Sequence, residues 1–171
     1  TPPHDMKKSI LPLLFLALPL LAVAQTKIAC FSYDGAFRSM PEYATVQQNL
    51  ETLKAKYDAE TKRAEDEFNA KYEAFLDGQR TFVSTILQKR QAELQELMDK
   101  NVAFKKEAAR LLSQAEQDAY RPLRDKLNAL LKRIAAERGY VLIINTDSNA
   151  CPYIDQSFAE DINNLVREAL K

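Results

Sequence analysis

The sequence predicts an α+β protein, mostly α, in which a long antiparallel helical hairpin projects from a small β body. Two observations carry this prediction. Residues 42–138 are rich in good helix formers and contain a single glycine, Gly78, and a single proline, Pro122. Short apolar runs at residues 27–33 and 140–145 flank this region and have the composition of strands. The two ends of the chain are therefore expected to meet in one body.

A single mature domain is expected, since the chain of 171 residues lies within the roughly 100–200 residues typical of one domain. Residues 1–24 are interpreted as an upstream extension and an export signal, and residues 25–171 as the mature domain. Within it, residues 25–40 and 139–171 form the body. Residues 41–138 form the hairpin, which must stand out from the body because its return helix spans on the order of 75 Å at about 1.5 Å per residue.

The first 24 residues have the features of a cleaved export signal. Two lysines follow Met6, a credible start that five residues precede. An apolar run over residues 10–21 then leads to the small residues of a cleavage site at 22–24. Cleavage after Ala24 is expected. The alternative is an uncleaved membrane anchor, which is disfavoured because the apolar run is shorter than the roughly 20 residues that span a bilayer.

Charge and composition exclude several classes of function. Removal of residues 1–24 takes away two lysines, one aspartate and the only histidine, His4, and leaves 22 basic and 23 acidic residues. This balance does not favour nucleic-acid binding. Without histidine, most zinc sites and His-based catalysis are excluded, and no phosphate loop or nucleophile–base pattern is present. We therefore expect no enzyme activity, no metal and no cofactor.

The hairpin is expected to comprise a first helix over residues 41–77, a tip within 78–86 and a return helix over 87–138. Asp-Gly at 77–78 is the natural break, and Pro122 is expected to kink the return helix. Apolar residues at alternating steps of three and four predict a seam between the helices. This seam includes Val46, Leu50, Leu53, Tyr57, Ala64, Phe68 and Phe75 on the first helix, and Leu94, Leu97, Met98, Val102, Ala108 and Leu111 on the second.

The body is expected to contain three short strands and a terminal helix. The first strand should place Ile28 and Cys30 on one face, with Ala29 and Phe31 on the other. A brief strand is predicted at residues 151–154, at the edge of the sheet because Pro152 cannot donate a ladder hydrogen bond. Asp161 should cap a helix whose apolar face is Ile162, Leu165, Val166 and Leu170.

Cys30 and Cys151 are the only cysteines. Two readings stay open. In an oxidising compartment the pair could form one disulfide, whereas two buried small residues in strands would need no bridge. Spacing in the sequence does not establish the geometry that a disulfide requires.

Continuous apolar strands with nothing in the chain to cover both faces predict pairing between subunits. At this point the order of elements resembles the Skp/OmpH family of periplasmic chaperones for outer-membrane proteins. The resemblance runs from KIACFSY at residues 27–33, through the charged hairpin, to GYVLIINTDSNACPYID at 139–155 and EDINNLVREAL at 160–170. The tail is the most specific part, because any charged helical hairpin would look like the middle.

The resemblance implies a homotrimer with a β-barrel body and three helical tentacles around a cavity. Unfolded outer-membrane β-barrel proteins would be held there without ATP, with no catalytic residues. The implied body and trimer contacts are Ile28, Cys30, Phe31, Val141, Leu142, Ile143, Ile144, Ile162, Leu165 and Val166. The candidate client contacts are Phe82 and Phe104, which lie off the predicted seam, together with Tyr72 and Phe75. The alternative for Tyr72 and Phe75 is that they pack in the core of the hairpin.

The charge balance departs from the best-known members of that family, which are strongly basic. Arg80, Lys89 and Arg90 give only a modest positive patch near the tip, and Glu93 and Glu96 follow closely. Binding to lipid or lipopolysaccharide is therefore not favoured. The alternative to a chaperone is a structural coiled-coil adaptor or spacer of the cell envelope, which would bind one specific folded partner.

We predict that the exported protein begins at Gln25. Expression of the whole chain in a Gram-negative host, followed by N-terminal sequencing of the periplasmic fraction, tests this. Ala24→Phe is the matched control, because a large side chain at the cleavage site should retain the leader. Recovery of the unaltered protein in the membrane fraction with residues 6–24 attached would contradict the prediction.

Overall fold

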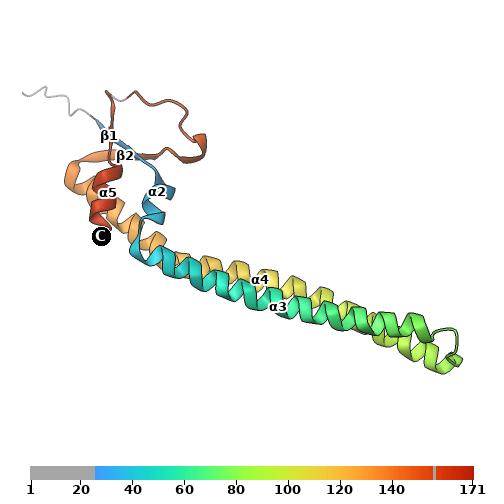
Figure 1. Cartoon of the computed structure of the whole chain (residues 1–171). Helices are drawn as coiled ribbons and strands as arrows, with labels where there is room; N and C mark the ends of the chain where they lie inside the picture. Colours follow the sequence, from blue (N-terminus) through green and yellow to red (C-terminus); the bar gives the residue numbers. More distant parts are fainter. Residues whose placement is uncertain (1–25, 156) are drawn as a thin grey trace, which may run out of the picture.

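The computed structural model describes residues 26–155 and 157–171, so the expected leader and Gln25 lie outside the described residues. Two long helices, α3 (Pro41–Gly78) and α4 (Ser84–Arg138), run antiparallel to each other and extend from a small body (Figure 1). At about 1.5 Å per residue, α4 is on the order of 80 Å long. The predicted hairpin is confirmed.

The residues at which the two long helices begin and end suit those positions. Pro41 occupies the first turn of α3, where its missing N–H has no helical partner to lose. Gly139 ends α4 in the left-handed conformation with a φ of 74°. The tip falls between Gly78 and Ser84, inside the predicted range, and α4 begins three residues earlier than predicted. The helix continues through Pro122 as one element.

The body is a three-stranded parallel sheet in which β1 (Lys27–Phe31) lies between β2 (Tyr140–Asn145) and β3 (Ala159–Asp161). Cys30, for example, pairs with Ile144 on one side and with Asp161 on the other. The central strand thus comes from one end of the chain and both its neighbours from the other end.

The strand predicted at residues 151–154 is wrong, and the third strand lies at Ala159–Asp161 instead. Residues 151–154 form bends and irregular chain. Pro152 cannot donate to a ladder. A turn then follows, in which the carbonyl of Asp155 accepts the N–H of Phe158 at 2.9 Å. The chain joins the sheet only after this turn.

One face of the sheet packs against helices. Ala29 and Phe31 are buried, while Ile28 and Cys30 are half-buried, which confirms the predicted alternation along β1. The core opposite β1 comes from α2 (Tyr33–Arg38), the body end of α4 and α5 (Asn163–Ala169). Its buried members include Ala36, Met40, Leu123, Leu127, Leu130, Ile134, Ile162, Val166 and Leu170.

Four aromatic rings join the hairpin to the body. Tyr33 and Phe37 on α2 stack at 6.1 Å between centroids, and Phe37 contacts Tyr43 of α3 at 5.6 Å and Tyr120 of α4 at 5.5 Å. Tyr43 and Tyr120 also stack on each other at 5.6 Å. We call these four residues the neck cluster. Since they join α2, α3 and α4, they fix the direction in which the hairpin leaves the body.

Asp147 fastens the loop after β2 to the start of α2. Its carboxylate accepts a hydrogen bond from the Ser32 hydroxyl at 2.6 Å and from the Asp34 N–H at 2.7 Å. Asn145 and Asn163 add amide oxygens that accept the N–H groups of Tyr33 and Ser32, at 3.1 and 2.8 Å. The Asp34 N–H, and then the Ser32 hydroxyl, hold the pKa of Asp147 below its ordinary value. The anchor is thus strongest when the carboxylate is charged.

The predicted cap of the terminal helix is shifted by one residue. Ile162 directly precedes α5, and its buried side chain enters the core. The carboxylate of Asp161, at the end of β3, accepts the N–H of Asn163 at 2.8 Å. Asp161 therefore satisfies the first backbone donor of α5 from the strand side.

We predict that Asp147→Asn lowers the free energy of unfolding at neutral pH by about 1 kcal/mol, a discounted value for a charge-assisted hydrogen bond at a partly exposed site. Because the folded pKa lies below the unfolded one, this contribution is present above the unfolded pKa of about 4 and is lost as pH falls through the folded pKa. The difference from the parent protein should therefore shrink on acidification.

Urea unfolding at pH 7, 5 and 3, followed by circular dichroism at equal protein concentration, measures this difference. Asp99→Asn, on the exposed surface of α4, is the matched control. A difference between parent and Asp147→Asn that stays constant across the three pH values would contradict the assignment.

Candidate functional site

The hairpin consists of only two helices, so each helix can bury one face at most and its other faces remain exposed to water. None of the described side chains of α3 is buried. In α4 the buried residues lie toward the body, from Ala108 to Ile134. Farther out, the contact between the helices consists of half-buried side chains, and much of the apolar surface stays in contact with water.

The seam on α4 follows Leu94, Leu97, Asn101, Phe104 and Ala108, the half-buried or buried residues at steps of three and four. Met98 and Val102, which were predicted in the seam, are 44% and 64% exposed, so that part of the prediction is wrong. Each follows a seam residue and is therefore rotated by about 100° around the helix. The sequence pattern favoured the apolar Val102 over the polar Asn101.

Asn101 belongs in the seam because the opposite helix offers it a partner. Its amide donates to the Ala64 carbonyl at 3.0 Å. Nearby, Lys105 pairs with Glu65, and closer to the body Lys126 pairs with Glu42 at 2.6 Å. These three contacts between the helices hold the register of α3 against α4, whereas most other ion pairs of the hairpin are local to one helix and stabilise little.

Six large apolar side chains of the distal hairpin are exposed by more than 40%. We call them the distal apolar surface. They are Tyr72, Leu76, Val83, Ile86, Met98 and Val102. Large exposed apolar side chains that gather in one region of a protein are candidates for an interaction surface. Of these residues, only Tyr72 was among the client contacts predicted from the sequence, and it stacks on Phe68 at 6.0 Å.

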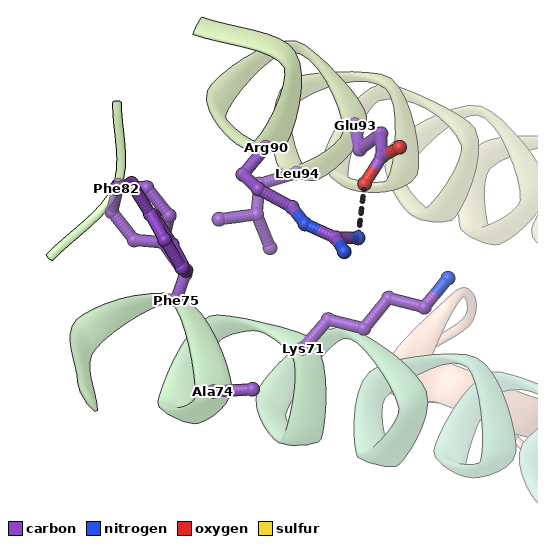
Figure 2. A pocket seen from close by; sticks show the side chains of 7 residues that line it. All are labelled: Lys71, Ala74, Phe75, Phe82, Arg90, Glu93 and Leu94. Carbon is purple, nitrogen blue, oxygen red and sulfur yellow. Dashed lines mark hydrogen bonds and ion pairs between the residues drawn. The ribbon is translucent and has the colours of Figure 1, made fainter. Parts of the chain in front are cut away.

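The tip contains a shallow pocket of about 210 Å³ between the two helices and the connecting loop (Figure 2). Phe75 from α3, Phe82 from the loop and Leu94 from α4 give it an apolar lining. The rings of Phe75 and Phe82 lie 6.4 Å apart between centroids. The structure therefore brings together two of the predicted client contacts.

Phe82 folds back over the end of α3, where a side chain on Gly78 would collide with it. A Cβ on residue 78 would overlap the outer edge of the Phe82 ring. The loop is held by Thr81, whose N–H and hydroxyl both donate to the Gly78 carbonyl at 2.9 Å. A larger residue at position 78 would therefore force this ring to move.

Phe104 does not belong to this group. It lies in the seam, half-buried, with its ring 6.3 Å from that of Tyr57. The prediction that it lies off the seam is wrong, for the same reason that Val102 was misplaced. Its contact with Tyr57 gives it a role in holding the two helices together.

The positive charges at the tip are largely paired. Glu93 accepts from Arg90 at 2.9 Å and lies 3.8 Å from Lys89 (Figure 2 draws the first of these contacts). Lys71 and Glu67 form a further pair at 3.1 Å. The tip surface therefore mixes apolar groups with charges of both signs.

The residues predicted as body and trimer contacts divide into two groups. Phe31, Ile162 and Val166 are buried in the core of the protomer itself, with Ile143 and Leu165 packed against it. The others face away from this core or stand at the surface. They are Ile28, Cys30 and Ile144, which are half-buried, and Val141 and Leu142, which are 69% and 51% exposed.

Two exposed aromatic side chains lie in the segment between β2 and β3, and neither was among the contact residues predicted from the sequence. Tyr153 and Phe158, in the segment between β2 and β3, are 80% and 75% exposed. Both are single aromatics in a polar loop, a signal too weak to single out from the sequence. Across the sheet, burial and the hydrogen bond that the Tyr140 hydroxyl on β2 donates to Glu160 on β3 raise the pKa of Tyr140 to about 12, which keeps its hydroxyl a donor.

Within residues 26–155 and 157–171, neither long helix carries an apolar stretch long enough to cross a membrane. The same residues contain no cluster of three or more His, Cys, Asp or Glu side chains arranged to hold a metal ion.

Comparison with known proteins agrees with this architecture. The family model described as outer membrane protein (OmpH-like) matches residues 27–170. The chain belongs to the OmpH-like family. Among curated protein sequences, none matches it significantly.

A solved structure of an OmpH-like protein from Caulobacter crescentus CB15, which its name describes as a proposed outer membrane chaperone, has the same fold. It is similar to this chain with a TM-score of 0.68 at 18% sequence identity, over 86% of this chain and 85% of that one. At 18% identity, this likeness shows that the two chains share a fold.

We predict that Gly78→Ala destabilises the tip, because its methyl group forces the Phe82 ring away from α3. In a Phe82→Ala background the same change should instead stabilise the helix end by up to about 1 kcal/mol, since alanine favours a helix over glycine. Amide hydrogen exchange of residues 75–79 measures the local opening free energy in the four proteins. A Gly78→Ala effect of the same sign in both backgrounds would contradict the proposed packing.

Proposed function

We propose that this OmpH-like protein is an ATP-independent holding chaperone of the periplasm. It binds unfolded outer-membrane β-barrel proteins between helical hairpins and prevents their aggregation. The observation that carries the proposal is the distal hairpin itself, which is long, incompletely packed and lined with exposed apolar side chains among balanced charges. Membership of the OmpH-like family and the similarity to a proposed outer membrane chaperone support it.

The distal apolar surface suits a client without fixed structure. Its side chains project from both helices and from the tip loop, so an extended chain can contact a few of them at a time. Each contact removes a modest apolar area from water and contributes on the order of 1 kcal/mol. Many weak contacts of this kind exchange readily, which permits release without an energy source.

A homotrimer is part of the proposal. Val141 and Leu142 stand exposed on β2, which is an edge strand of the sheet. An exposed, apolar edge strand tends to pair with another chain. Pairing between copies would remove this edge from water and set several hairpins around one cavity. The charge pattern of the mature chain gives no reason to add nucleic acid or lipid to the partners.

Location in the periplasm follows from the export signal interpreted in residues 1–24 and from the nature of the proposed clients. Outer-membrane β-barrel proteins pass through that compartment unfolded. Cleavage after Ala24 would free the mature chain to meet them there.

We predict that residues 25–171 suppress light scattering when a urea-unfolded outer-membrane β-barrel protein is diluted into buffer without ATP. Client and chaperone should then elute together from a sizing column. Met98→Ser with Val102→Ser should weaken client binding about tenfold, because two partly exposed apolar contacts of about 1 kcal/mol or less each are lost. Phe82→Ser alone should also weaken it, whereas Phe104→Ser should act mainly by loosening the seam, because Phe104 packs on Tyr57.

Gln88→Ser with Gln91→Ser is the matched control, since both glutamines are exposed on α4 and uncharged. Circular dichroism and the elution volume of each variant alone establish that it is folded and oligomeric. Unchanged aggregation of several clients in the presence of the folded oligomer would favour the structural adaptor. That alternative also requires a specific folded partner and no protection of unfolded chains.

A further inference from the structure

We propose that Cys30 and Cys151 form a disulfide that fastens the loop after β2 to the outer face of the sheet. In the structure both cysteines are free thiols, and both are half-buried. They line one shared pocket between β1 and the loop, together with Thr146, Tyr153, Ile154 and Asp161. The proposal concerns the body of the protomer and does not depend on the hairpin or on its clients.

The sheet register places Cys30 where the loop can reach it. Ala29 and Phe31 point into the helical core, so Cys30 points to the opposite face. Its neighbours across the sheet are Ile144 on β2 and Asp161 on β3. The loop that contains Cys151 connects those two strands, and Cys151, Tyr153 and Ile154 of this loop line one pocket with Cys30.

Few interactions oppose the approach of the Cys151 sulfur. Residues 151–154 belong to no helix or strand, and within the described chain they make no backbone-to-backbone hydrogen bond. The Cys151 thiol donates only to the Tyr153 carbonyl, at 3.4 Å. A disulfide needs Cα atoms about 4.4–6.8 Å apart, and a segment this loosely held can adjust to that geometry.

The two thiols would take different parts in the reaction. Burial, and then the nearby Asp161 and Cys151, raise the pKa of the Cys30 thiol, so it is a poor nucleophile on its own. Cys151, on the loop, attacks the disulfide of an oxidant as its thiolate and releases one oxidant thiol. Cys30 then loses its proton and attacks the Cys151 sulfur of the mixed disulfide, releasing the second oxidant thiol.

The net reaction balances. Two protein thiols lose two electrons and two protons and become one disulfide, while the oxidant disulfide is reduced to two thiols. An oxidising compartment outside the cytosol supplies disulfides of this kind. The bridge would join the central strand to a loop more than a hundred residues later, which restricts the unfolded chain strongly.

The test uses the mature chain equilibrated with oxidised glutathione or, in parallel, with a reducing agent. After unfolding and alkylation, the oxidised sample should contain no free thiol, a single monomer band without reductant, and a peptide pair linking Cys30 to Cys151. Chymotryptic cleavage after the exposed Tyr153 should slow several-fold on oxidation. Cys30→Ser and Cys151→Ser are the matched controls, and neither should show the redox effect on cleavage.

Two results would overturn the proposal. One is the persistence of two free thiols per folded chain at equilibrium with the oxidant, under conditions in which a control dithiol peptide is fully oxidised. The other is a disulfide between copies, seen as a dimer band whose linked peptides join identical cysteines. Because every readout is made without a client, failure of this inference leaves the proposed chaperone function untouched.

Discussion

The structure depends on the parallel pairing of β1 with two strands from the other end of the chain. Parallel neighbours cannot be joined by a tight turn and need a crossover of about a dozen residues or more. Here the crossover from β1 to β2 contains the entire hairpin (Figure 1). Closing the sheet requires only a small part of that length. The remainder extends into solvent and is available for a function that the sheet itself cannot supply.

The neck cluster fixes the direction in which this long connection leaves the body. Phe37, Tyr43 and Tyr120 come from three different helices, and their rings contact one another at 5.5–5.6 Å. Such aromatic contacts contribute roughly 0.5–1.5 kcal/mol each beyond the area they bury. The base of the hairpin is therefore well packed, whereas its distal half has only a half-buried seam. Close packing at one end and exposed apolar surface at the other are what the proposed chaperone function requires.

The sequence was sufficient for the architecture because the decisive signals are strong and local. Gly78, Pro41 and Gly139 mark the ends of the long helices, and alternation along β1 marks its two faces. The seam of α4 was harder to predict, because Asn101 replaces an apolar residue and obtains its hydrogen bond from the other helix. Polar residues with a partner that is distant in the sequence give no local pattern, so Val102 and Phe104 were each assigned to the wrong side.

The same limit applies to the body and to the candidate site. The third strand follows the turn at Asp155, and only its pairing with β1 identifies it as a strand. The neck cluster and the anchor at Asp147 join residues that are distant in the sequence, so neither has a signature in one segment. The exposure of Met98 and Val102 depends on how α4 is rotated about its axis, which the sequence pattern alone does not determine.

The topology of the sheet determines when the body can fold during synthesis or export. The first strand to emerge during synthesis or export is β1, yet both its partners lie beyond residue 139. Pairing must therefore wait until almost the whole chain has crossed, and contacts so distant in sequence form slowly. During that interval the helical hairpin can form, while an apolar strand remains exposed. The proposed chaperone of unfolded chains thus passes through an incompletely folded state of its own, in which the unpaired β1 is open to aggregation.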